Sequence, residues 1–176
     1  MPWPVTVLLV LLVLFVVLPY FWGMALKDET VGVLHVVLPV PPERVWDELQ
    51  QGERHPVSGA MARSIRTLEG GPGAWEEDLG NTRVTVRTVV AEAPRRCVRE
   101  MQDAVVPMTA RWTLELEPHE EGTFVRAENR TVVRSGSWRS PIFRLILRAS
   151  GGSQKVLREY FRSIAGALGV TARAQS

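Results

Sequence analysis

The sequence predicts an α+β fold in which an antiparallel sheet of about six or seven strands is covered by a long C-terminal helix and preceded by one transmembrane helix. Three observations predict it. The first 26 residues carry no charged side chain. Segments between residues 61 and 133 alternate apolar with polar residues and are joined by short turns. Apolar residues then recur at helical spacing between residues 142 and 168.

The N-terminal segment, residues 1–26, is predicted to be a transmembrane anchor. Residues 5–18 are almost entirely valine and leucine, so the helix has no polar face and does not suit the core of a soluble domain. As a helix, residues 3–22 span roughly 28 Å, close to the roughly 30 Å hydrocarbon layer. Trp3 lies at one end and Tyr20, Phe21 and Trp22 at the other, where aromatic rings settle among lipid headgroups.

A cleaved signal peptide is the alternative for this segment, because Gly23-Met24-Ala25 offers small residues to a signal peptidase. No lysine or arginine precedes the apolar run, however, and the run is long for a signal peptide, which favours a retained single-pass anchor. Lys27 is the only basic residue near either end, which favours a cytoplasmic domain but leaves the side of the membrane open. The solitary Cys97 is compatible with a reducing compartment.

The domain opens with a strand that passes quickly into a helix. The apolar run 33–38 ends in a proline-rich turn. Pro42 suits the first helical turn, where its missing N–H would have no partner, and Glu43 favours the positive end of the helix dipole. The apolar face of this helix is expected to consist of Val45, Trp46 and Leu49.

A second short helix or turn is expected at His55-Pro56, followed by an antiparallel meander. The expected strands cover residues 61–68, 74–79, 83–88, 96–102, 110–117 and 123–133. Connections of two to five residues cannot carry a parallel crossover. The Gly-Gly-Pro-Gly segment at residues 70–73 could also cradle phosphate, but neither Lys-Ser/Thr nor a long helix follows it, so a hairpin turn is favoured.

The last two strands alternate most clearly, and each is expected to bury one face. In the first, alanine, tryptophan and leucines at 110, 112, 114 and 116 lie opposite arginine, threonine and glutamates. In the second, residues 125, 127, 129, 131 and 133 share a face, and charged residues occupy the other. Charged residues suit a sheet face in water, so the apolar face needs a cover.

Two apolar helical segments at the C-terminal end supply that cover. Residues 142–147 are strongly apolar, and residues 156–168 repeat apolar side chains at helical spacing. Gly151-Gly152 is expected to hinge or break the helix between them, and Ser153 is expected to cap the second part.

This order of elements, together with the motif Val45-Trp46-Asp47, resembles the START-like superfamily, also called SRPBCC or polyketide cyclase/dehydrase-like. The resemblance covers residues 29–169. It implies a helix-grip domain over residues 27–170 and a C-terminal tail over residues 171–176. In that family a curved sheet wraps the C-terminal helix and leaves a ligand cavity between them.

The resemblance therefore implies an inward-facing set of cavity residues from the last two strands and the C-terminal helices. These are Trp112, Leu114, Leu116, Val125, Ala127, Asn129, Thr131, Val133, Phe143, Leu157, Tyr160, Phe161 and Ile164. Asn129 and Thr131 are the polar members. They either orient a ligand in an apolar pocket or satisfy each other, the backbone or a water molecule.

The sequence indicates neither a metal nor a cofactor. His35, His55 and His119 lie on separate elements without metal-ligand spacing, and one cysteine adds little. The carboxylates 76–78 could bind a cation, but a solvated hairpin is the favoured interpretation. The sequence has no Gly-x-Ser-x-Gly motif, and its spacing places no histidine beside a nucleophile.

Three functions are consistent with these features. The leading hypothesis is a membrane-anchored binding module, tethered through residues 5–22, for an apolar small molecule such as a lipid, an isoprenoid quinone or a polyketide-like compound. The alternative is a cyclase, aromatase or dehydratase using the same cavity, for which Glu100, Tyr160, His35 and His55 are the candidate acids and bases. A module that binds a protein partner is a third possibility. Acidic and basic residues are interleaved and the net charge is +2, which argues against nucleic-acid binding.

Overall fold

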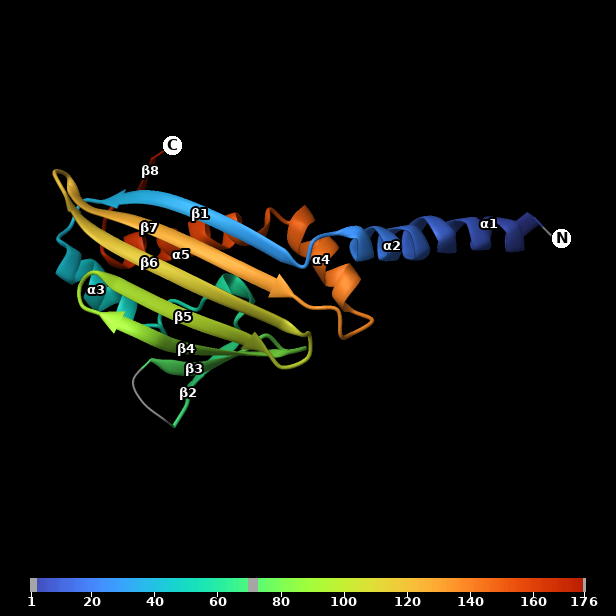
Figure 1. Cartoon of the computed structure of the whole chain (residues 1–176), viewed down its shortest axis with the longest axis horizontal. Coiled ribbons are helices and arrows are strands. Elements are labelled where there is room, and N and C mark those ends of the chain that lie inside the picture. Colours follow the sequence, from blue (N-terminus) through green and yellow to red (C-terminus); the bar gives the residue numbers. More distant parts are fainter. Residues whose placement is uncertain (1–2, 70–72, 176) are drawn as a thin grey trace.

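The computed structural model describes residues 3–69 and 73–175, and Figure 1 shows an apolar helix projecting from one end of a curved sheet. Its elements in chain order are α1 (Trp3–Leu12), the π-helical turn η1 (Val13–Val17), α2 (Leu18–Ala25), β1 (Glu29–Leu38), α3 (Pro42–Gln50), the 3₁₀ turn η2 (Gly59–Met61), β2 (Ser64–Thr67), β3 (Ala74–Asp78), β4 (Arg83–Glu92), β5 (Arg96–Asp103), β6 (Met108–His119), β7 (Gly122–Val133), α4 (Ser140–Ala149), α5 (Gly152–Ala167) and β8 (Arg173–Gln175).

The eight described strands form one antiparallel sheet in the order β2-β3-β4-β5-β6-β7-β1-β8. The first strand therefore lies beside the last long strand, with Leu34 opposite Ala127. Strands β1 to β7 confirm the expected meander. β8, within the segment assigned to the tail, adds a three-residue edge strand that pairs with β1.

The buried face of the sheet is the one that the alternation predicts. Trp112 and Leu114 on β6 are fully buried, and every second residue of β7 from Val125 to Val133 is buried as well. Helix α5 packs against this face, mainly on β1 and β7, and the sheet curves around it (Figure 1). The core thus lies between α5 and the strands it covers.

Helix α3 confirms the expected apolar face, because Val45, Trp46 and Leu49 are its buried residues. The short helix or turn expected at His55-Pro56 is a series of turns that leads into the 3₁₀ turn Gly59–Met61. The strand expected over residues 61–68 is shorter, because β2 covers only Ser64–Thr67. A side chain holds the backbone before the 3₁₀ turn, because the Glu77 carboxylate accepts hydrogen bonds from the backbone N–H groups of Val57 and Ser58.

The turn expected at residues 70–73 falls mostly outside the described residues, which omit 70–72. Gly73 itself has a φ of +91°, and β2 and β3 on either side of the turn pair antiparallel. This backbone conformation favours glycine, since a Cβ is strained at positive φ.

The C-terminal helix is broken where the sequence predicts. Gly151 and Gly152, with φ values of +90° and +57°, end α4 and begin α5. The expected cap is wrong, because Ser153 makes no capping bond. Its hydroxyl faces the sheet instead and donates a hydrogen bond to Thr131 Oγ1 at 3.3 Å.

The N-terminal helix runs from Trp3 to Ala25, and among the described residues it alone is long and apolar enough to cross a membrane. At 1.5 Å per residue it is about 34 Å long. Pro19 has no N–H to donate to the preceding turn, and the helix loosens there into the π turn η1. Near its end Gly23 is buried against the backbone of Pro141, so α2 packs directly on α4.

Candidate functional site

The inner side of the sheet holds a partly open cavity of about 510 Å³ between the sheet, α4 and the start of α5. Its fourth wall is the segment after α3, and the β3–β4 turn closes one side. Its lining residues are Val57, Ser58, Ala60, Met61, Arg63, Leu79, Asn81, Thr82, Val84, Met101, Asp103, Met108, Ala110, Trp112, Asn129, Thr131, Phe143, Leu147, Ser153 and Val156. Such a lining, mostly apolar with a few polar groups, is typical of small-molecule sites.

Four of the predicted cavity residues line this space. Trp112, Asn129 and Thr131 contribute from β6 and β7, and Phe143 contributes from α4. Trp112 and Asn129 are direct partners across the two strands. The three sheet residues therefore belong to one wall of the cavity, and Phe143 belongs to the wall that α4 forms.

The other predicted residues lie outside this cavity, where helix and sheet are in contact. Those in the packed core are Leu114, Leu116, Val125, Ala127, Leu157, Tyr160, Phe161 and Ile164. Tyr160 packs edge-on against both Trp112 and Phe161, at centroid distances of 5.0 and 5.5 Å. Phe161 also borders a separate hollow of about 420 Å³ between β1 and the end of α5. Val133, also buried, lies beyond the cavity, where its carbonyl accepts two hydrogen bonds from Arg144.

Several lining residues were missed by sequence reasoning. Ala110 carried a usable signal, since it lies on the same face of β6 as Trp112. Val84 alternates inward on β4 in the same way. Met61 and Arg63, by contrast, come from irregular backbone, and no periodic pattern could have placed them.

A strip of polar side chains crosses the cavity wall. Thr131 Oγ1 donates to Asn129 Oδ1 at 3.0 Å, and Ser153 Oγ donates to Thr131 Oγ1 at 3.3 Å. Thr30 continues this polar strip at 3.3 Å from Ser153. Asn129 and Thr131 therefore satisfy each other in part. Trp112, the cross-strand partner of Asn129, has a buried indole Nε1 with no hydrogen-bond partner among the described residues.

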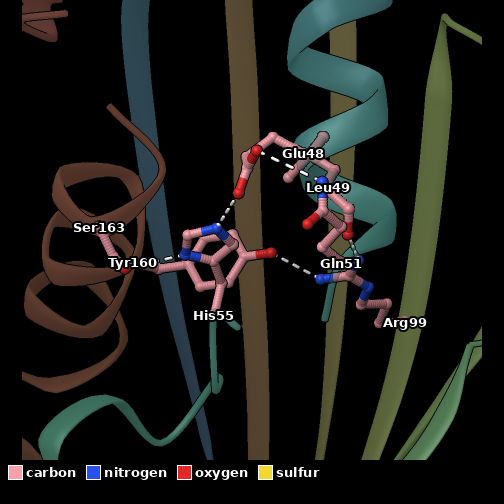
Figure 2. Close-up of polar contacts among 7 residues, drawn as sticks. All are labelled: Glu48, Leu49, Gln51, His55, Arg99, Tyr160 and Ser163. Atoms are coloured by element: carbon pink, nitrogen blue, oxygen red, sulfur yellow. Dashed lines mark hydrogen bonds and ion pairs between the residues drawn. The ribbon is translucent and has the colours of Figure 1, made fainter. Parts of the chain in front are cut away.

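A buried cation lies next to the cavity wall, because Arg99 is the direct partner of Trp112 across β5 and β6, and Figure 2 shows its contacts. Arg99 on β5 donates to the Tyr160 hydroxyl at 2.6 Å and to the Leu49 carbonyl. Its guanidinium also lies 5.1 Å from the centroid of the Trp75 ring. Burial raises the pKa of Tyr160 above its ordinary value although Arg99 opposes the shift, so the hydroxyl stays protonated at neutral pH.

Glu77 is the buried carboxylate of the same region. The carboxylates 76–78 were expected to face solvent on a hairpin, but Glu77 is fully buried. Its carboxylate accepts hydrogen bonds from the backbone N–H groups of Val57 and Ser58, at 2.8 and 2.9 Å, and from Trp75 Nε1 at 2.8 Å. Glu77 thus fixes one wall of the cavity to β3.

Within the described part of the chain no cluster of three or more His, Cys, Asp or Glu side chains is arranged to hold a metal ion.

Figure 2 also shows a serine, histidine and glutamate in contact, an arrangement that the sequence did not predict. His55 Nδ1 lies 2.9 Å from Ser163 Oγ, and His55 Nε2 lies 2.6 Å from Glu48 Oε1. Ser163, however, lies within α5, where neighbouring backbone N–H groups are used by the helix itself and cannot stabilise an oxyanion. The contacts tie the segment around His55 to α3 and α5.

Comparisons with known proteins were made for both sequence and structure. Neither the family models nor the curated protein sequences give a match. Protein MLL2253 from Mesorhizobium loti is similar in structure, with a TM-score of 0.54 at 17% identity over 80% of this chain and 97% of that one. Ara h 8.0201 gives a TM-score of 0.54 at 12% identity over 79% and 97% of the two chains. DynU16, from the dynemicin biosynthetic locus, gives 0.51 at 11% identity over 82% of this chain and 48% of its own.

At these identities the likeness shows the fold alone. The chain has a helix-grip fold. In this helix-grip domain the cavity occupies the half of the grip nearer the N-terminal helix, since α4 both lines the cavity and packs on α2.

The four candidate acids and bases of the helix-grip domain do not line its cavity. Glu100 is exposed on the outer sheet face, where it pairs with Arg111 at 2.8 Å. His35 packs on Phe124, and Tyr160 and His55 belong to the buried polar contacts described above. The carboxylate at the cavity, Asp103, accepts hydrogen bonds from Thr82 and from two backbone N–H groups, which order the loop after β5.

A second hollow, of about 500 Å³, lies over the outer face of the helix-grip sheet. Arg87, Arg111 and Arg130 rise around it from three strands, and Glu100 is placed among them. The residues that line this hollow are mostly polar or charged, whereas those of the inner cavity are mostly apolar, so the inner cavity is the better candidate for a small-molecule site.

Proposed function

We propose that this protein is a single-pass membrane protein whose helix-grip domain binds an apolar small molecule, such as a lipid, an isoprenoid quinone or a polyketide-like compound. The observation that carries the proposal is the internal cavity of about 510 Å³, walled mainly by apolar side chains, in a domain joined to a helix apolar enough to cross a membrane. A tether suits such a ligand because it keeps the cavity near the bilayer in which the ligand dissolves.

The ligand we propose has an apolar body and one polar end. The apolar body would lie against Met101, Phe143 and Val156. The polar end would meet the polar strip and the indole N–H of Trp112, which has no partner among the described residues. A hydrogen-bond acceptor placed there would relieve a buried unsatisfied donor, which costs about 1–3 kcal/mol when left unpaired.

We propose that residues 1–26 are retained as the anchor. The contact between α2 and α4 supports this, because cleavage near Ala25 would remove a helix end that packs on the domain through Gly23. Lys27, which follows the span, supports a cytoplasmic domain.

The test is native mass spectrometry of the full-length protein purified in detergent, followed by extraction and identification of the small molecules that co-purify. Near-stoichiometric recovery of one apolar species is expected. Ala110→Phe, which places a ring in the cavity, is expected to reduce the bound fraction several-fold. Ala91→Phe, at an exposed position of β4, is the matched control and should leave it unchanged.

Two results would contradict the proposal. One is a full-length protein that carries no apolar molecule after purification and takes none up from lipid vesicles. The other is an Ala110→Phe variant that folds, as judged by circular dichroism, and retains the ligand at the level of the control.

A further inference from the structure

Helix α4 carries an unpaired apolar stripe on its outer side. Trp138, just before the helix, and Ile142 and Ile146 within it follow one another at four-residue spacing and are 68%, 37% and 56% exposed. We call these three residues the α4 stripe. Val105, from the loop between β5 and β6, lies beside it and is 43% exposed. In water, a surface of this kind marks an interaction site.

The position of α4 relative to the N-terminal helix indicates what covers the stripe. α4 packs against α2, and Gly23 contacts the backbone of Pro141. Figure 1 shows α4 and the loop after β7 at the end of the domain from which the N-terminal helix projects. α4 therefore lies beside the last turns of the candidate span, at the level of Trp22, where a membrane-crossing helix meets the headgroups.

The charges at this end fit a lipid surface. Lys27, Arg139 and Arg148 are exposed there, and the Arg139 guanidinium lies 5.3 Å from the centroid of the Trp138 ring. The nearby Asp28 already pairs with the buried Arg144 at 2.8 Å. A helix with an apolar stripe flanked by arginines suits the boundary between phospholipid headgroups and acyl chains.

The same helix is also a wall of the internal cavity. Phe143 and Leu147 line the cavity, whereas Ile142 and Ile146 line a separate surface hollow of about 450 Å³, together with Trp138 and Val105. Phe143 borders both spaces, as do Asn81 and Thr82. One helix thickness therefore separates the cavity from the surface that carries the stripe.

We propose that the α4 stripe lies in the headgroup region of the same bilayer that the N-terminal helix spans, so that the α4 wall of the cavity faces the membrane. This inference rests on the proposed membrane anchor. The partner of the stripe is a phospholipid surface. Anionic headgroups strengthen this contact because they attract Lys27, Arg139 and Arg148.

Site-directed spin labelling of the full chain tests the proposal. The protein is reconstituted into nanodiscs of phosphatidylcholine and phosphatidylglycerol, with Cys97 replaced by alanine and single cysteines introduced as Ile146→Cys or Trp138→Cys. Leu8→Cys, in the candidate span, and Val89→Cys, exposed on β4, are the controls. The measurement compares collisions of each label with molecular oxygen, which concentrates in lipid, and with a water-soluble nickel complex.

The labels at Ile146 and Trp138 are expected to collide preferentially with oxygen, as the label at Leu8 does, whereas the label at Val89 collides preferentially with nickel. Labels at both stripe positions that behave like Val89 while Leu8 is in lipid would overturn the α4 proposal and leave the anchor intact. A label at Leu8 that collides preferentially with nickel would instead overturn the anchor, and with it the proposed function. Two stripe positions guard against a local effect of either substitution.

Discussion

Arg99 is a fully buried cation whose direct partners in the described structure are neutral. It contacts a tyrosine hydroxyl, a backbone carbonyl and the face of Trp75, and Glu77, hydrogen-bonded to the Trp75 indole, is the buried negative charge of the same region. The two charges balance across an aromatic ring rather than through an ion pair. Such an arrangement depends on every member, because a buried polar group is costly once its partner is removed.

The substitution Arg99→Met tests this dependence. It leaves the Tyr160 hydroxyl and the Leu49 carbonyl without their donor, and we expect it to lower the free energy of unfolding by about 2–3 kcal/mol. Arg111→Met, whose ion pair with Glu100 is half exposed, is the control and should cost less than about 1 kcal/mol. Urea unfolding in detergent, followed by the fluorescence of the buried tryptophans, measures both. Equal costs would show that the buried contacts of Arg99 contribute no more than a surface pair.

Single residues were predictable where the pattern of one strand determines their position. The inward direction of Asn129 and Thr131 follows from the alternation along β7, and both are buried. The burial of Glu77 was not predictable, because its partners Val57 and Ser58 lie about twenty residues away in irregular backbone. The contact of His55 with Ser163 likewise joins residues 108 positions apart.

At the scale of elements, the contact between α2 and α4 joins the N-terminal helix to the domain. Glycine permits it, because any side chain at position 23 would overlap the Pro141 carbonyl. The short connection that follows α2 is thereby held close to the domain, and it contains Lys27, a single tryptic site.

We expect Gly23→Val to separate α2 from α4 and to increase the rate of tryptic cleavage after Lys27 several-fold, while the domain itself stays folded. Gly166→Val is the matched control, since a side chain at that position of α5 meets no neighbouring atom. Time-resolved proteolysis of the full chain, followed by intact-mass analysis, measures the rate. Equal rates for the two variants would contradict direct packing at Gly23.

Most elements were predictable, because their patterns are local. The proline-rich turn into α3 and the glycines between α4 and α5 both lie where the sequence indicates. Ser153 shows the limit of local reasoning, since a hydroxyl suited to a cap bonds to Thr131 on β7 instead. The tertiary partner, which the local sequence does not contain, decides between the two.

For the whole molecule, the central question is whether the N-terminal helix stays attached. We expect the protein isolated from membranes to retain residues 1–26, because α2 is packed on the domain. Intact-mass spectrometry of the membrane fraction after alkaline washing measures this. The mass of a chain that starts after Ala25, or release of the protein from the membrane by the alkaline wash, would favour the signal-peptide alternative.

The position of the cavity was the least predictable feature. Leu114 and Trp112 share one face of β6, yet Trp112 lines the cavity whereas Leu114 packs in the core. The difference arises from the cover, because Tyr160 and Phe161 of α5 pack on one part of the sheet, whereas α4 faces the part that lines the cavity. A strand pattern specifies which way a side chain points but not how far away the opposing helix lies.

The size of the cavity also bears on how the protein responds to compression. Folded proteins lose volume on unfolding in proportion to the internal void that disappears, so hydrostatic pressure favours the unfolded chain most when a void is empty. A space of about 510 Å³ would make the unliganded domain sensitive to pressure, and a molecule that fills the space would remove much of that sensitivity. Pressure therefore offers a way to detect occupancy without knowing what the occupant is.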